Sequence, residues 1–483
     1  MASTSVIKAL ISYAPGVILP RIVALVMLVL LTRLMPQREY GLYALVIAMG
    51  EAVDLVCSNW VRIALERFGS GKPNSLGAEV LRCMKIYGIT LAMALLLALV
   101  IAFNAVPGQF WSFLAALTAY ILSAAVVRLA SAIMLVRNDR RGFLLMEIGR
   151  ALLVLATGLA VTQLSGTFFA VTLATSGATL AIGVWGGLRC GRDLDFAEAS
   201  DVSLRNLLSF GLPLIPAAII SAALASTDRF ILALLTGPAT VALYSAAMVL
   251  AKQPMEFLFS VSNTRVFSHV MASYENEGPQ AAPKNLAELT SGFAFLTFPA
   301  AAGIILVRDP FARLFLAPDY VDMAKVIIPF VVIATLLSGF KNFVFDMIFH
   351  MTRRSATNAW SSIPALIAGT LAMICLIPYY GIMGCVISYT AQSIILFLTV
   401  FFTTRRWIRI PVPWLDLLKT AIATSGMAGM LIAVTPLTLH LPVAIDLAVR
   451  IGAGVLTFGA FAFLLRPGPV LEYFPHRAVR PVR

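Results

Sequence analysis

The sequence predicts an all-α polytopic membrane protein with fourteen transmembrane helices, arranged as two six-helix repeats and two further C-terminal helices. Three observations support this fold class. The 483-residue chain is 60% hydrophobic and only 12% charged, with a mean hydropathy of +0.91, whereas a soluble protein of this size needs far more polar surface. Apolar segments that can cross the ~30 Å hydrocarbon core follow one another along nearly the whole chain. Basic residues gather in alternate connections between these segments.

Fourteen segments have the length and apolar character of a membrane span. We expect them at 13–34, 41–63, 84–104, 109–134, 143–164, 166–188, 206–234, 239–263, 289–307, 322–348, 355–377, 380–403, 414–435 and 442–465. Two of them contain paired prolines, which are Pro15 and Pro20 in the first span and Pro213 and Pro216 in the seventh. Because each proline removes a backbone hydrogen bond, we expect a kink in both helices.

The connections predict the orientation in the membrane. Lys and Arg concentrate in alternate connections, at Arg67, Lys72, Arg82, Arg137, Arg140, Arg141, Arg189, Arg192, Arg205, Arg265, Lys284, Arg353, Arg354, Arg405, Arg406 and Arg409. The intervening connections are nearly free of them, with Arg38, Arg308 and Arg313 as exceptions. Since cytoplasmic loops carry the basic excess, both termini are predicted to be cytoplasmic. The same excess accounts for the net charge of +13 without a nucleic-acid partner.

The first hairpin returns 201 residues later in the chain. Pro15, Ile18, Ala24, Leu31, Leu34, Leu42 and Tyr43 match Pro216, Ile219, Ala225, Leu232, Leu235, Leu243 and Tyr244. Because each repeat holds an even number of spans, the two copies share one orientation, and their pseudo-two-fold axis runs along the membrane normal. We therefore expect an N-lobe at 1–188, a cytoplasmic connector at 189–205, a C-lobe at 206–404, two further helices at 405–466 and a cytoplasmic tail at 467–483.

Metal and disulfide chemistry is not expected. The five cysteines are scattered and odd in number, which argues against a disulfide framework and a thiolate metal site, and the four histidines are equally dispersed. We expect no cofactor. The N-terminal apolar run is too long for a signal peptide and has no cleavage signal after it.

Acidic residues lie inside the predicted spans, where a charge at the bilayer centre costs ~2.5–3.5 kcal/mol. In the second span, Glu51 and Asp54 lie on one helical stripe with Ser58 and Arg62. In the eighth span, Glu256 lies one turn after a lysine. We expect the carboxylates of Glu51, Asp54 and Glu256 to face a water-filled cavity, where they bind H⁺ or Na⁺ or hold basic side chains in place.

Basic residues accompany these carboxylates at similar depth. Arg21 lies in the first span without a partner on its own helix, Arg128 lies near the inner end of the fourth span, and Arg150 lies in the fifth. Lys252 occupies in the second repeat the position of Glu51 in the first. A cluster of these four residues can hold a diphosphate or an acidic sugar through charge-assisted hydrogen bonds. The alternative is local pairing on one helix, Glu147 with Arg150 and Lys252 with Glu256.

These segments resemble a known family. PGVILPRIVALVMLVLLTRLMPQREYGLYAL, SFGLPLIPAAIISAALASTDRFILALL, LFLAPDYVDMAKVIIPF and LIPYYGIMGCVISY are similar to the polysaccharide-exporter branch of the multidrug/oligosaccharidyl-lipid/polysaccharide (MOP) exporter superfamily. The resemblance covers nearly the whole chain. It implies a Wzx-like, O-antigen-type flippase in the bacterial inner membrane, which moves undecaprenyl-diphosphate-linked oligosaccharide to the outer leaflet by alternating access. It also implies a central cationic cavity, with Arg21 as the nearest match to lipid-diphosphate-binding residues, and polysaccharide polymerase and chain-length or export proteins as partners.

Three alternatives stay open. A cation-coupled multidrug antiporter of the same superfamily is expected to have carboxylates in an otherwise apolar cavity, whereas arginines and a lysine accompany the acids here. A lipid II flippase has the same overall plan. A glycosyltransferase is disfavoured, since Asp193 and Asp195 form an Asp-x-Asp motif but no connection is long enough for a nucleotide-sugar domain. We therefore expect a secondary transporter and not an enzyme.

Overall fold

The computed structural model describes residues 19–69, 76–192, 194, 203–278, 280, 282–352, 354–408 and 412–468, apart from the side chains of 260–273, 275–277 and 355. These residues form helices and the turns between them, and the described part of the chain holds no strand. Pro15, the Asp-x-Asp motif, and most of the predicted connector 189–205 and tail 467–483 lie outside the described residues.

Twelve helical segments are long and apolar enough to cross a membrane, counted over the described residues, and they match twelve of the fourteen predicted spans. The two predicted spans without such a match are the first and the eighth. The first span, 13–34, is described only from residue 19, and residues 19–34 are helical. The eighth, 239–263, lies within one continuous helix that carries Lys252 and Glu256. The chain is thus a multi-pass membrane protein, while the count of fourteen and the repeat stay predictions.

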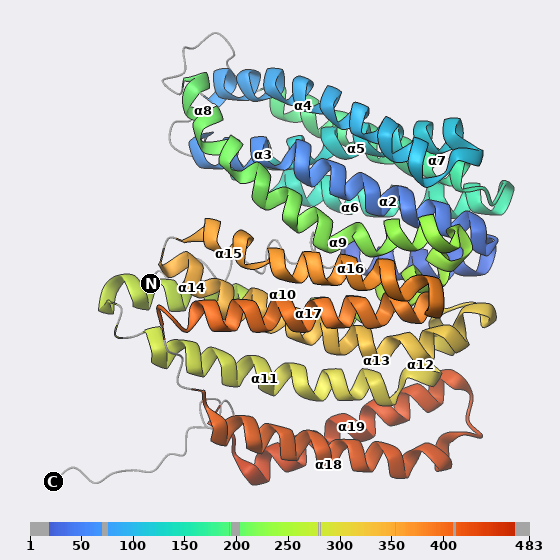
Figure 1. The fold of residues 1–483 in the computed structure, drawn as a ribbon, viewed down its shortest axis with the longest axis vertical. Helices are drawn as coiled ribbons and strands as arrows, with labels where there is room; N and C mark the ends of the chain where they lie inside the picture. Colours follow the sequence, from blue (N-terminus) through green and yellow to red (C-terminus); the bar gives the residue numbers. More distant parts are fainter. Residues whose placement is uncertain are drawn as a thin grey trace. The chain divides into compact units, whose positions relative to one another are not determined.

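The chain divides into two compact units. Unit 1 contains the described residues through Ala246 together with Thr370–Cys385, and unit 2 contains Ala247–Gly369 and the described residues from Val386 on. The helices of unit 1 are α2 (Gln37–Cys57), α3 (Asn59–Gly69), α4 (Leu76–Ala105), α5 (Phe110–Val136), α6 (Arg140–Leu164), α7 (Phe168–Gly191), α8 (Leu204–Gly211) and α9 (Ile215–Thr236). Within this unit α7 packs along α5 and α6, and α2 packs against α9 and α5 (Figure 1).

Unit 2 is built from α11 (Ala282–Leu306), α12 (Arg308–Phe315), α13 (Pro318–Phe340), α14 (Asp346–Met351), α15 (Ser355–Ser361), α18 (Trp414–Thr438) and α19 (Val443–Leu465). Three helices contribute residues to both units, which are α10 (Pro238–Glu277), α16 (Ile363–Tyr380) and α17 (Ile382–Thr404). Within unit 2, α18 and α19 form an antiparallel pair, and α11 packs against α18 (Figure 1).

Local breaks in the helices follow the sequence. The seventh predicted span is interrupted by a 3₁₀ turn at Leu212–Leu214, where Pro213 and Pro216 remove backbone donors, as the proline pair predicts. α10 continues through Glu277, well beyond the predicted end of the eighth span at 263, and ends where Gly278 adopts a φ of 81°. Hydropathy predicts where a helix leaves the apolar layer, whereas glycine and proline determine where the helix itself ends.

Candidate functional site

The second predicted span is not one uninterrupted helix. α2 ends at Cys57 and α3 begins at Asn59, with Ser58 outside both. Arg62 on α3 nevertheless reaches back to Asp54 on α2, where its Nη1 and Nη2 donate to the two carboxylate oxygens at 2.9 and 2.8 Å. Both side chains are buried, with exposed fractions of 10% and 1%. The predicted stripe on this span is therefore closed by a buried bidentate ion pair, the strongest form of the arginine–carboxylate contact.

Arg128 on α5 joins this buried pair to a more accessible carboxylate. Its guanidinium donates to Asp54 and, through the other terminal nitrogen, to Glu51 on α2. The Arg128 side chain is 30% exposed and that of Glu51 is 47% exposed, in contrast to the buried Asp54. The Asp54 carboxylate thus accepts hydrogen bonds from two arginines. In the resulting group, Asp54 and Arg62 form a buried part, which we call the floor. Arg128 and Glu51 form an accessible part, which we call the rim.

Gly50 allows Tyr120, a neutral hydrogen-bond partner of Glu51, to pack against α2. The Tyr120 hydroxyl on α5 donates to Glu51. An ideal Cβ at Gly50 would lie only 2.2 Å from the Tyr120 ring, so this ring lies directly on the α2 backbone at a position that no larger residue can occupy. Gly50 and Tyr120 therefore bring α2 and α5 together at the level of the ion pairs.

A second pair extends the group along α5. Ser131, one turn beyond Arg128, donates to Glu147 on α6 at 3.2 Å, and Glu147 accepts from Arg150 Nη2 at 2.6 Å. Arg150 is 32% exposed, and its Nε has no hydrogen-bond partner among the described residues. Arg128 lies roughly 12 Å from the end of α5 and Arg150 roughly 15 Å from the start of α6, at ~1.5 Å per residue, so both lie at similar depth.

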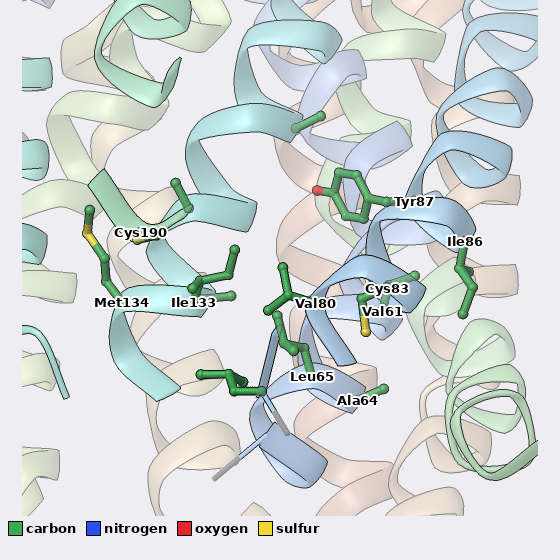
Figure 2. Close-up of a cluster of buried hydrophobic side chains, with 14 of the residues drawn as sticks. Val61, Ala64, Leu65, Val80, Cys83, Ile86, Tyr87, Ile133, Met134 and Cys190 are labelled. Atoms are coloured by element: carbon green, nitrogen blue, oxygen red, sulfur yellow. The ribbon is translucent and has the colours of Figure 1, made fainter. Parts of the chain in front are cut away.

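We refer to these six side chains as the charge network, comprising Glu51, Asp54, Arg62, Arg128, Glu147 and Arg150. Its charges balance, with three acids and three bases. A hydrophobic cluster lies beside it, built from α3, α4 and α5 with contributions from α6, α7 and α8. Figure 2 shows Val61 and Leu65 of this cluster packed beside Val80 and Cys83 of α4. Tyr87, also in the cluster, accepts a hydrogen bond at 3.0 Å from Arg62, so the floor of the network is fixed in the packed core.

The charge network presents both arginine and carboxylate side chains with accessible surface. Within the described ranges, no three His, Cys, Asp or Glu side chains gather where they could hold a metal ion. The partly accessible side chains are those of Arg128, Arg150 and Glu51. Such groups inside a span are stable only against water, a polar ligand or each other.

The remaining predicted residues lie elsewhere in the chain. Arg21 is half-buried on the helical residues 19–34, a helix that contacts α6 where Met27 packs against Gly158. In unit 2, the Lys252 Nζ lies 4.8 Å from the centroid of the Tyr389 ring and forms a cation–π contact, and the Glu256 side chain is exposed. The site roles of Arg21, Lys252 and Glu256 stay predictions.

One local pairing can be compared directly with the structure. Glu147 and Arg150 form the pair on one helix that their spacing allows. Tyr120, Tyr87 and Ser131 were not singled out from the sequence, because a neutral hydroxyl in a span carries no penalty that marks it. The spacing of Tyr120, Arg128 and Ser131 along one face of α5 is a signal that could have found Tyr120 and Ser131, but not Tyr87 on α4.

Comparison with known proteins agrees with this fold. The profile of the family described as polysaccharide biosynthesis protein matches residues 30–325. The sequence matches none of the curated proteins with which it was compared. A structure of the lipid II flippase MurJ in an inward closed conformation has a TM-score of 0.74 at 14% identity, and the match covers 94% of this chain and 99% of the flippase.

Two transporters of the MOP superfamily are also similar in structure. An inward-facing multidrug resistance MATE family transporter has a TM-score of 0.59 at 14% identity, with 82% of this chain and 97% of the transporter covered. A MOP superfamily transporter from Pyrococcus furiosus has a TM-score of 0.51 at 15% identity, with 83% and 95% covered. The chain therefore belongs to the polysaccharide biosynthesis protein family and has the fold of the MOP superfamily transporters.

Proposed function

We propose that this protein is a flippase that moves an undecaprenyl-diphosphate-linked oligosaccharide from the inner to the outer leaflet of the bacterial inner membrane. The observation that carries the proposal is the charge network, because it places arginine donors with an accessible rim inside membrane-spanning helices. Membership of this chain in the polysaccharide biosynthesis protein family supports a glycan cargo. Transport proceeds by alternating access, with both termini in the cytoplasm.

The diphosphate of the cargo is bound by guanidinium groups. Arg150 is the best placed of the described arginines, since a third of its side chain is accessible and its ion pair with Glu147 uses one terminal nitrogen, Nη2. Arg128 is already engaged by two carboxylates, so it contributes charge and position more than free donors. Arg21 and Lys252 are further proposed diphosphate-binding residues. Charge-assisted hydrogen bonds of this kind contribute ~1.5–3 kcal/mol each.

Coupling to H⁺ or Na⁺ is assigned first to Glu51. Its carboxylate is half-exposed, whereas both oxygens of Asp54 are occupied by arginines inside the packed floor. Asp54 therefore orients Arg62 and Arg128, and Glu256 is the second coupling candidate. Polysaccharide polymerase and chain-length or export proteins are the proposed partners that receive the cargo.

The multidrug antiporter is the main competing function. A carboxylate that binds cationic drugs needs free oxygens, and the occupied state of Asp54 disfavours that use of the network. A lipid II flippase is the second competitor, supported by the similarity in fold to MurJ. The antiporter and the lipid II flippase share with the proposed flippase a membrane location and the absence of a catalytic step. Only the cargo distinguishes the three functions.

The test is a flipping assay with purified protein in proteoliposomes. The cargoes are a fluorescent undecaprenyl-diphosphate oligosaccharide, fluorescent lipid II and a cationic dye. The wild-type protein is expected to flip the first cargo fastest. Arg150→Gln should flip it at least about tenfold more slowly, because one charge-assisted contact is lost. Arg192→Gln, which removes an exposed charge beyond the end of α7, serves as the matched control and should keep the wild-type rate.

The outcomes separate the functions. Equal rates for the Arg150 and Arg192 variants would remove Arg150 from the binding site. Transport of the dye without flipping of either lipid would establish the antiporter, and preference for lipid II would establish the third function.

A further inference from the structure

Basic residues at the end of α11 break the predicted charge pattern. Arg308 and Arg313 lie on α12, in a connection on the side predicted to be outside, where the other connections are nearly free of Lys and Arg. Lys325 lies two turns into α13. Since basic residues near spans oppose translocation to that side, three of them in one place are expected to have a function of their own.

The same residues surround a hollow in unit 2. It has a volume of about 530 Å³ and is lined by Arg308, Asp309, Lys325, Val326, Pro329 and Phe330. This volume falls within the about 300–1,000 Å³ that is usual for small-molecule sites. Part of the lining is charged, and Val326, Pro329 and Phe330 form an apolar wall, as expected for a ligand with both polar and apolar faces.

Of the basic residues around the hollow, Arg313 and Lys325 form ion pairs with carboxylates, whereas Arg308 forms none among the described residues. Lys325 Nζ lies 3.2 Å from Asp309 and 2.8 Å from Asp322, and Arg313 Nε lies 3.0 Å from the other oxygen of Asp309. Arg308 is exposed and has no ion pair or hydrogen bond with the residues that the structure describes. The lining therefore carries a net charge of +1, and its unpaired base is a guanidinium that opens on the hollow.

We propose that this hollow binds an acidic sugar, whose carboxylate pairs with Arg308. Guanidinium and carboxylate match in geometry and form two parallel hydrogen bonds. The hydroxyl groups of the sugar are both donors and acceptors, so Asp309 accepts from them while Lys325 donates to them. The apolar face of the ring packs on Pro329 and Phe330. A phosphate group alone uses Arg308 but leaves this apolar wall without a partner.

The inference rests on the proposed flippase function, because it makes the hollow the place where the glycan is held at the outer side. α11 is about 38 Å long at ~1.5 Å per residue, so Arg308 and Lys284 lie at opposite ends of one span. The hollow is thus a site for the sugar, separate in sequence and in unit from the charge network that is proposed for the diphosphate.

The experiment is saturation-transfer NMR on the purified full-length protein, with glucuronate, glucose and inorganic phosphate as probes. Wild-type protein should saturate the ring protons of glucuronate at least threefold more than those of glucose. Arg308→Gln should lose the glucuronate signal. Lys284→Gln, the matched loss of one exposed charge at the other end of α11, should keep it, and so should Arg150→Gln. Unchanged thermal unfolding midpoints establish that the variants are folded.

Three results would overturn the inference. These are an equal glucuronate signal from Arg308→Gln, an equal signal from glucose, and displacement of glucuronate by an equal concentration of phosphate, which marks a lipid-headgroup or simple anion site. The two proposals fail separately. Flipping by the wild-type protein without a glucuronate signal would contradict this inference alone. A glucuronate signal without flipping would contradict the proposed flippase function alone.

Discussion

Two groups of buried charges lie inside membrane-spanning helices, and they differ in what they connect. The charge network of unit 1 joins α2, α3, α5 and α6, and its rim at Glu51 and Arg128 is accessible. In unit 2, Asp446 and Arg450 pair within α19 with exposed fractions of only 10% and 5%. Arg450 also donates to Thr438 and Thr435 of α18 at 3.1 and 3.2 Å. The first group is open on one side, and the second is sealed.

The difference shows that a charge inside a span does not by itself indicate a binding site. The sealed pair satisfies itself and ties α19 to α18, so it has nothing left to offer a ligand. The open network is balanced in charge but keeps groups with an accessible surface, and only these can exchange a protein partner for a ligand. Accessibility therefore separates a candidate site from a structural clamp.

The largest effect is expected where one carboxylate holds two arginines. Asp54→Ala leaves Arg62 and Arg128 without the anion between them, and removing one partner of a buried ion pair typically costs ~3–5 kcal/mol. We expect a large drop in the thermal unfolding midpoint in detergent. Glu288→Ala removes a half-exposed carboxylate and should change stability by less than ~0.5 kcal/mol. Similar midpoints for the two variants would mean that Asp54 does not hold the floor of the network.

The sealed pair should behave differently when both partners are replaced. Arg450→Leu alone strands the buried Asp446 and should destabilise by ~3 kcal/mol, whereas Asp446→Leu with Arg450→Leu should return to within ~1 kcal/mol of the wild type. The double variant should also keep its flipping rate in proteoliposomes. If the double variant is as unstable as the single one, or folds but no longer transports, the pair is more than a clamp.

The smallest effect is expected outside the membrane, at the start of α6. Asp139 caps this helix by accepting from the Gly142 N–H at 2.9 Å, and it pairs with Arg189 at 3.1 Å. The Gly142 N–H and then the Arg189 guanidinium hold the pKa of the Asp139 carboxyl below its usual value. Asp139→Ala should cost about 1 kcal/mol through loss of the cap.

The pH dependence of this cap has a definite sign. Because the pKa is lowered in the folded state, the ionised carboxylate adds stability above the unfolded pKa of about 3.9, and this is lost as the pH falls through the lower folded pKa. Asp139→Asn keeps the cap without the charge. Its thermal unfolding midpoint should lie slightly below that of the wild type from pH 7 to about 5, and the gap should close as the pH falls through the lowered folded pKa. A gap that widens on acidification would contradict this assignment.

Much of the site could be predicted because a charge in an apolar segment is conspicuous. The stripe of Glu51, Asp54 and Arg62 was visible from spacing alone, as was the pair of Glu147 and Arg150. The contact of Arg128 with Glu51 was not, since it joins residues 77 positions apart. The contact of Lys252 with the Tyr389 ring is also absent from local spacing, since it joins α10 to α17.

The sequence by itself determined the class, the membrane location and twelve of the spans, because hydropathy and length are local properties that lipid imposes on every helix. Only the tertiary structure decided which charges meet. A carboxylate in a span has several bases within its possible reach, and the choice among them depends on how closely two helices pack, as where Gly50 admits Tyr120 against α2. That packing depends on two segments that are distant in sequence, so it cannot be predicted from either segment alone.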